Sequence, residues 1–115
     1  MEARATSKYI RISPQKARLV VELIRGKSAG EAASILLLTK KRIALEIAKV
    51  LHSAISNAEE RGENVDVDRL VVSKAFVNEG PRMKRIRPAP MGRAFHYQRR
   101  MSHITLVVEE PENRG

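Results

Sequence analysis

The sequence predicts an α+β fold: three helices packed on a small three-stranded antiparallel sheet, with a long protruding basic β-hairpin. Three observations predict it. Apolar residues recur at helical spacing through the first half of the chain. Two runs rich in β-branched residues, 70–77 and 104–108, follow in the second half and are typical of strands. The segment 79–103 that includes their connection has three prolines, seven Arg or Lys residues and few residues that could build a core.

The first elements are a short strand and a helix. Residues 8–12 alternate polar and apolar side chains, which predicts the strand. Ser13 and Pro14 then mark a helix start, because Ser is a good N-cap and Pro in the first turn loses no helical hydrogen bond. We expect this helix to run to about Arg25 and to stop at Gly26. Its apolar face comprises Ala17, Val20, Val21 and Ile24.

Two further helices follow. Ser28 and Glu31 have the spacing of a capping box, which predicts a second helix to about Leu38. The polar residues 39–41 interrupt the pattern, and a third helix then extends to about Gly62. Its apolar stripe comprises Ile43, Ile47, Val50, Leu51, Ala54, Ile55 and Ala58.

The three predicted strands lie near 8–12, 70–78 and 103–109. We expect a single domain over 1–115, with a globular part of about 1–78 and 103–110 and an extended hairpin of about 79–102. The hairpin would turn near Pro88–Gly92 and project about 40 Å, at about 3.3 Å per residue. Since a two-stranded hairpin is marginally stable alone, it requires a supporting partner.

The charge of the chain indicates what that partner is. The formal net charge is +9. Residues 1–30 carry +5 and residues 79–103 carry +6, whereas residues 31–78 are neutral and the C-terminal residues 104–115 carry −2. Two basic segments around a neutral centre favour a polyanionic partner, either nucleic acid or an anionic membrane surface.

Several classes of function are disfavoured. The chain has no cysteine, which excludes disulfides and thiolate metal sites. His52, His96 and His103 stand in no metal-ligand or catalytic motif, so we expect no enzyme activity, no metal and no cofactor. The start of the chain has neither a signal peptide nor an anchor, and no stretch approaches the roughly 20 apolar residues that span a bilayer.

The first group of candidate RNA-binding residues lies around the first helix. Lys16 stands in its first turn, where a cation opposes the helix dipole, and phosphate binding would compensate for that cost. The alternative is an ordinary solvated face. The group comprises Arg11, Lys16, Arg18, Arg25 and Lys27.

The second group lies in the hairpin. Arg predominates over Lys there, and Arg makes planar bidentate contacts to phosphate. The basic members are Arg82, Lys84, Arg85, Arg87, Arg93, Arg99 and Arg100, with His103 beside them. Phe95 and Tyr97 either stack on unpaired bases or pack across the hairpin.

Four segments carry a resemblance to a known family: YIRISPQKARLVVELIRGKS, EGPRMKRIRP, MGRA and SHIT, which begin at residues 9, 79, 91 and 102. They closely resemble the bacterial large-subunit ribosomal protein twenty-two family, and the resemblance covers essentially residues 3–108. R-I-S-P-x-K and G-P-x-M-K-R, in this order and at this separation, are a specific signal.

The resemblance implies a structural constituent of the large ribosomal subunit, located in the cytoplasm within the ribosome. Its implied partners are large-subunit ribosomal RNA, neighbouring large-subunit ribosomal proteins and the nascent polypeptide, but no membrane. The protein would aid assembly of the RNA and line the peptide exit tunnel with its hairpin tip. The implied tunnel residues are Met83, Lys84, Arg85, Pro88, Ala89, Pro90, Met91 and Gly92. Ala89 departs from the family, since many relatives have Arg there.

The sequence disfavours two alternative functions. The first two helices permit a helix-turn-helix regulator that binds duplex DNA, but the second helix, AGEAASILLL, has almost no side chains that read bases. A membrane-active basic hairpin would need a sustained apolar face opposite its charge, which the sequence lacks.

Overall fold

The computed structural model of the chain describes residues 2–61, 65–80, 83–88 and 94–111. The elements follow in the order β1 (Glu2–Ile10), α1 (Pro14–Ile24), α2 (Ala29–Leu38), α3 (Arg42–Arg61), the 3-10 helix η1 (Val67–Arg69), β2 (Val71–Glu79), β3 (Met83–Pro88), β4 (Ala94–Arg99) and β5 (Ser102–Glu109).

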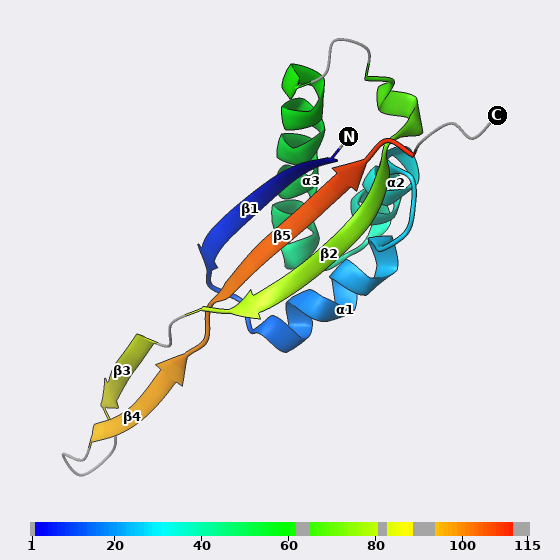
Figure 1. The fold of residues 1–115 in the computed structure, drawn as a ribbon. Helices are drawn as coiled ribbons and strands as arrows, with labels where there is room; N and C mark the ends of the chain where they lie inside the picture. Colours follow the sequence, from blue (N-terminus) through cyan, green and yellow to red (C-terminus); the bar gives the residue numbers. More distant parts are fainter. Residues whose placement is uncertain (1, 62–64, 81–82, 89–93, 112–115) are drawn as a thin grey trace.

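The last strand of the chain forms the centre of the main sheet. Strand order is β1-β5-β2, with both neighbours antiparallel to β5. Leu106 pairs with Ala5 on one side and with Ala75 on the other. The three helices lie on one face of this sheet (Figure 1). The expected α+β architecture is therefore confirmed.

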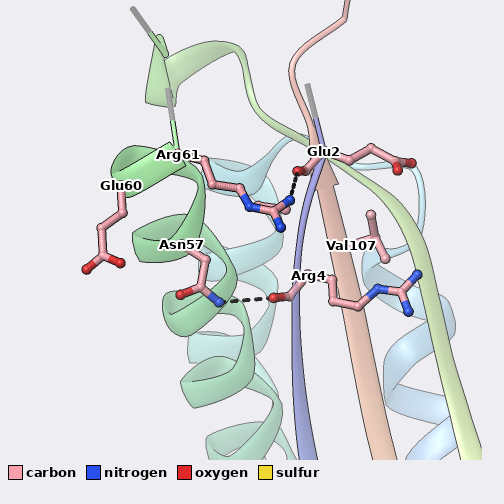
Figure 2. A pocket seen from close by; sticks show the side chains of 7 residues that line it. Glu2, Arg4, Asn57, Glu60, Arg61 and Val107 are labelled. Atoms are coloured by element: carbon pink, nitrogen blue, oxygen red, sulfur yellow. Dashed lines mark hydrogen bonds between the residues drawn. The ribbon is translucent and has the colours of Figure 1, made fainter. Parts of the chain in front are cut away.

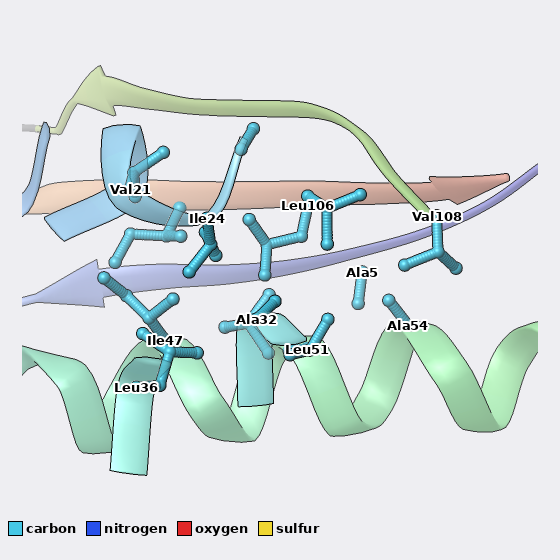
Figure 3. Packing of buried hydrophobic residues seen from close by; sticks show 14 of the residues in the cluster. Ala5, Val21, Ile24, Ala32, Leu36, Ile47, Leu51, Ala54, Leu106 and Val108 are labelled. Atoms are coloured by element: carbon cyan, nitrogen blue, oxygen red, sulfur yellow. The ribbon is translucent and has the colours of Figure 1, made fainter. Parts of the chain in front are cut away.

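Aliphatic residues of the helices and the sheet form one core (Figure 3). Ile24 of α1, Ile47 of α3 and Leu106 of β5 are fully buried. Ala5 and Ala54 are also buried where α3 packs on β1, and their small side chains let the helix approach the strand closely. No aromatic residue belongs to this cluster of described residues.

The predicted helix starts are confirmed. The hydroxyl of Ser13 accepts a hydrogen bond from the backbone N–H of Lys16 at 3.4 Å, and the hydroxyl of Ser28 accepts one from Glu31 N–H at 3.2 Å. These are the N-cap interactions that Ser makes at the start of a helix. After α1, Gly26 adopts a positive φ of 80°, which Gly allows without strain.

The first strand differs from its prediction. We expected residues 8–12, but β1 spans Glu2–Ile10. Ala3 and Ala5 alternate inward along it, and because Ala has a weak preference for strands the pattern gave little signal. A bulge between Ser7 and Ile10 interrupts the pairing with β5, and the strand ends at Ile10 rather than at residue 12.

The hairpin leaves the main sheet between β2 and β5, as predicted. β3 and β4 form a separate two-stranded antiparallel sheet, and Gly80 N–H donates to the carbonyl of Met101 at 2.8 Å where the hairpin begins. Pro88 and Ala94 form the last pair of the ladder, so the predicted tip residues Ala89, Pro90, Met91 and Gly92 lie outside the described residues. The molecule measures 72 × 26 × 18 Å along its principal axes.

Candidate nucleic-acid interface

Helix α1 exposes cations beside the edge strand β2. Lys16 and Arg18 are exposed because the apolar positions of α1 turn toward the core, and Arg25 and Lys27, which follow α1, are also exposed. Arg11, in the turn before α1, is exposed as well. The first predicted group is thus exposed around α1, and its members Arg18 and Arg25 reach the edge strand β2.

Two arginines of this group also contact the protein itself. Arg18 donates from Nε and Nη2 to the carbonyl of Val77, at 3.3 and 3.0 Å. Arg25 donates in the same way to the carbonyl of Ala75, at 3.1 and 2.7 Å. A guanidinium has five N–H donors, so each arginine retains donors for a phosphate after binding its carbonyl.

The opposite edge of the sheet is covered by α3. Asn57 donates to the carbonyl of Arg4 at 3.0 Å, and Arg61 donates to the carbonyl of Glu2 at 3.2 Å (Figure 2). The hollow between α3 and β1 measures about 460 Å³. Side chains therefore donate hydrogen bonds to backbone carbonyls on both edges of the sheet. Carbonyls that are already bonded in this way are less available to pair with a strand of another molecule.

His103 makes a hydrogen bond and a ring contact with Tyr9 at the base of the hairpin. Its Nδ1 accepts a hydrogen bond from the backbone N–H of Tyr9 at 3.0 Å, which leaves Nε2 to carry the ring proton. The two rings meet edge to face, with centroids 5.0 Å apart. A Cβ atom at Gly80 would lie 3.1 Å from Cε1 of His103. His103 thus links the end of β1 to the start of β5 and lies close beside Gly80, which follows β2.

Ser102 makes a second tie at the same root. Its side chain is fully buried, and its hydroxyl donates to the carbonyl of Ile12 at 2.6 Å. Arg100, two residues before β5, is exposed. The base of the hairpin is therefore fastened to the turn that precedes α1, next to the first group of cations.

The second predicted group lies on the hairpin. Lys84, Arg85 and Arg87 belong to β3, and Arg99 belongs to β4. The ladder pairs Met83 with Arg99, Arg85 with Tyr97, and Arg87 with Phe95. Arg82 and Arg93 lie outside the described residues.

Three residues that the sequence did not single out gather near Arg11. Lys8, Tyr9 and Arg42 line, with Arg11, a hollow of about 670 Å³ between the end of β1 and the start of α3. Lys8 and Arg42 are far apart in the chain, so only the fold brings their charges together. Tyr9 stood inside the predicted strand, and a bulge cannot be recognised from that alternation.

The arrangement suits the binding of anions. Among the described residues, no cluster of His, Asp or Glu could hold a metal ion. In the same part of the chain, every helix is too short or too polar to cross a membrane. The exposed groups are chiefly ammonium and guanidinium donors, which bind phosphate oxygens.

Comparison with known proteins places this chain among ribosomal proteins. The family model described as "Ribosomal protein L22p/L17e" matches residues 5–109. A protein of Solibacter usitatus named "Large ribosomal subunit protein uL22" is 63% identical over 112 residues, covering 97% of this chain and 99% of the relative. Proteins of the same name are 55% identical in Koribacter versatilis, over 100% of this chain and 72% of the relative, and 56% identical in Halothermothrix orenii, over 96% of each.

Proposed function

Since the chain belongs to the ribosomal protein L22p/L17e family, it is a structural component of the large ribosomal subunit, and we propose that it binds the RNA of that subunit. The two basic groups, one along α1 and one on the β3–β4 hairpin, would make the contacts. Catalysis would belong to the RNA, and the protein would hold RNA segments in place.

The separate β3–β4 sheet is the observation that carries this proposal. Its strands pair with each other and, within the described part of the chain, with no other strand. A ladder of this kind is marginally stable in water. Lys84, Arg85 and Arg87 lie on one strand and Arg99 on the other, so phosphates on neighbouring RNA segments would neutralise the ladder and support it.

The α1 surface supplies a second point of attachment. Lys16 and Lys27 are exposed near the two ends of α1, and Arg18 and Arg25 are exposed between them. Because Arg18 and Arg25 are held by carbonyls of β2, their guanidinium groups are oriented before RNA binds. Less side-chain entropy is then lost on binding than for a free side chain.

The family resemblance supports a role of the hairpin tip in the peptide exit tunnel. We propose that the globular part docks on the surface of the subunit in the cytoplasm, beside neighbouring ribosomal proteins, while the hairpin enters the RNA. The tip would then line the exit path of the nascent polypeptide. The departure at Ala89 removes a cation that many relatives have there, so the remaining tip contacts would rest on the residues of β3.

The test follows a tagged full chain into ribosomes. We would express it in bacteria and separate subunits on sucrose gradients at high salt, which strips loosely held basic proteins. Two variants accompany it: one lacks residues 82–100, and the other carries Lys84→Gln, Arg85→Gln, Arg87→Gln and Arg99→Gln. The substituted variant keeps the length of the hairpin and removes its charge.

We expect the full chain to remain with the large subunit and both variants to dissociate at lower salt. Because β3 and β4 pair with no other described strand, deletion should change the free energy of unfolding by less than about 1 kcal/mol. Urea unfolding checks that point. A full chain that runs at the top of the gradient, while native ribosomal proteins stay bound, contradicts the proposed function.

A further inference from the structure

Tyr9 adopts a backbone conformation that a bulky side chain rarely takes. Its φ is 61°, and it is the one residue other than Gly with a positive φ among those the structure describes. Such a conformation is strained for a large L-residue and persists only where the surroundings impose it. Strained residues of this kind cluster at binding sites, so the position warrants a functional explanation.

The strain serves to aim the ring outward. The bulge between Ser7 and Ile10 breaks the alternation of β1, and bulges re-aim side chains in this manner. The hydrogen bond from Tyr9 N–H to His103 holds the backbone, and the His103 ring meets the Tyr9 ring at 87°. The edge-to-face contact uses at most one face of the Tyr9 ring, and the residue stays 59% exposed.

Tyr9 lines a basic hollow, called here the Tyr9 hollow. Ser7, Lys8, Tyr9, Ile10, Arg11, Ile12, Arg42 and Glu46 line it, and it measures about 670 Å³. Lys8, Arg11 and Arg42 bring three positive charges. Glu46 is its one carboxylate among these lining residues, and it lies 3.7 Å from the ammonium of Lys49. The lining therefore has an excess of positive charge beside an exposed aromatic ring.

We propose that the Tyr9 hollow holds an unpaired nucleotide of structured RNA, with its base stacked on Tyr9. Lys8, Arg11 and Arg42 would contact the phosphates on either side of it. The inference rests on the proposed function, and it names one point at which the globular part would contact the RNA. Stacking on an aromatic ring with flanking cations is how proteins hold single-stranded bases.

Chemistry favours a nucleotide over an acidic protein segment. An acidic segment would use the three cations but would leave the oriented aromatic ring without a matching group. A nucleotide uses both, because it joins a flat base to an anionic backbone. Glu46 would repel a phosphate, but its carboxylate could accept a hydrogen bond from an amino group on the edge of a base.

The experiment measures binding of the full chain to transcribed large-subunit ribosomal RNA. Tyr9→Gly removes the ring and accepts the positive φ without strain, and Tyr9→Asn is a second variant that tolerates this conformation. Phe76→Thr is the matched control, since Phe76 is an exposed aromatic on β2, outside the hollow. Urea unfolding of each variant verifies that the fold persists, and ultraviolet crosslinking of the unsubstituted chain to RNA, followed by mass spectrometry, locates the contact.

We expect Tyr9→Gly and Tyr9→Asn to weaken RNA binding by about fivefold to about a hundredfold, the range for loss of one base–aromatic stack. Tyr9→Phe and Phe76→Thr should bind as the unsubstituted chain does, and Tyr9 should carry a crosslinked nucleotide. RNA binding that is unchanged in both Tyr9 variants, with no crosslink at Tyr9, overturns the inference and leaves the proposed function standing. An unsubstituted chain that does not bind the RNA overturns both.

The experiment must also distinguish RNA from a neighbouring protein as the occupant of the Tyr9 hollow. Benzoylphenylalanine at position 9, photoactivated in assembled large subunits, captures whatever contacts the ring. Capture of RNA supports the inference. Capture of a protein without any RNA overturns it.

Discussion

The globular part and the β3–β4 hairpin are built on opposite principles, although one continuous chain forms both. In the globular part, three helices and three strands bury a shared aliphatic core, and side chains cover carbonyls on both sheet edges. In the hairpin, two strands pair only with each other among the described residues. The globular part is thus stabilised from within, whereas the hairpin, under the proposed function, would rely on a partner of opposite charge. Stability and binding can therefore be altered separately.

The largest difference in unfolding free energy between the two regions should come from a substitution in the core. Leu106 is fully buried at the centre of β5, so Leu106→Ala should lower the free energy of unfolding by about 2–5 kcal/mol, through lost burial and a residual cavity. Urea denaturation followed by circular dichroism measures this. Ile86→Ala on β3 is the control, and we expect a change of less than about 1 kcal/mol, because β3 pairs only with β4 among the described strands. Equal losses at the two positions would show that the hairpin shares the cooperativity of the core.

A smaller effect is expected at the root that joins the two regions. Ser102→Ala removes the hydroxyl that donates to Ile12, and should cost about 1–3 kcal/mol because a carbonyl beside the core loses its partner. Thermal unfolding provides the measurement, with the exposed Ser34→Ala on α2 as control. If Ser102→Ala unfolds at the temperature of the unsubstituted protein, the hydrogen bond from Ser102 to Ile12 does not stabilise the base of the hairpin.

The smallest effect concerns the cations that serve both the fold and the proposed RNA contact. Arg25→Met removes two hydrogen bonds to the carbonyl of Ala75 and should cost about 1 kcal/mol, since the guanidinium is exposed and screened by solvent. Lys27→Met removes the same charge from an exposed side chain and should leave the free energy of unfolding nearly unchanged. Both should weaken RNA binding.

Isothermal unfolding in urea and RNA titration at two salt concentrations distinguish the two roles. Each lost phosphate contact lowers the salt dependence of binding by about one unit of slope. A variant Arg25→Met with unaltered stability would mean that its bonds to β2 contribute nothing to the fold.

Much of the fold could be predicted because its signals are local. Ser13 and Ser28 mark helix starts through hydrogen bonds that reach only three residues along the chain. The stripe of α3 repeats at helical spacing, and Ile43, Ile47, Val50, Leu51, Ala54 and Ala58 are buried. Residues 2–7 of β1 were missed, because Ala3 and Ala5 become strand residues only when β5 pairs with them. Pairing between the two ends of a chain has no local signature.

The residues of the candidate site also divide into those that local sequence signals identify and those that only the fold brings together. The cations of α1 and of the hairpin could be identified from the sequence, because their charges cluster along the chain. Lys8 and Arg42 could not, because thirty-three intervening residues fold into two helices before the two cations line one hollow. Tyr9 could be seen as an aromatic residue, but its positive φ depends on the bulge and on the bond to His103.

The sequence by itself thus determined the helices, the later strands, the family resemblance and the segregation of charge, since each of these depends on spacing along the chain. The tertiary structure alone decided that Arg18 and Arg25 cover an edge of the sheet, that His103 links β1 to β5, and that Tyr9 lines a basic hollow. These features arise because antiparallel pairing with β5 brings residues about ninety positions apart within hydrogen-bond distance.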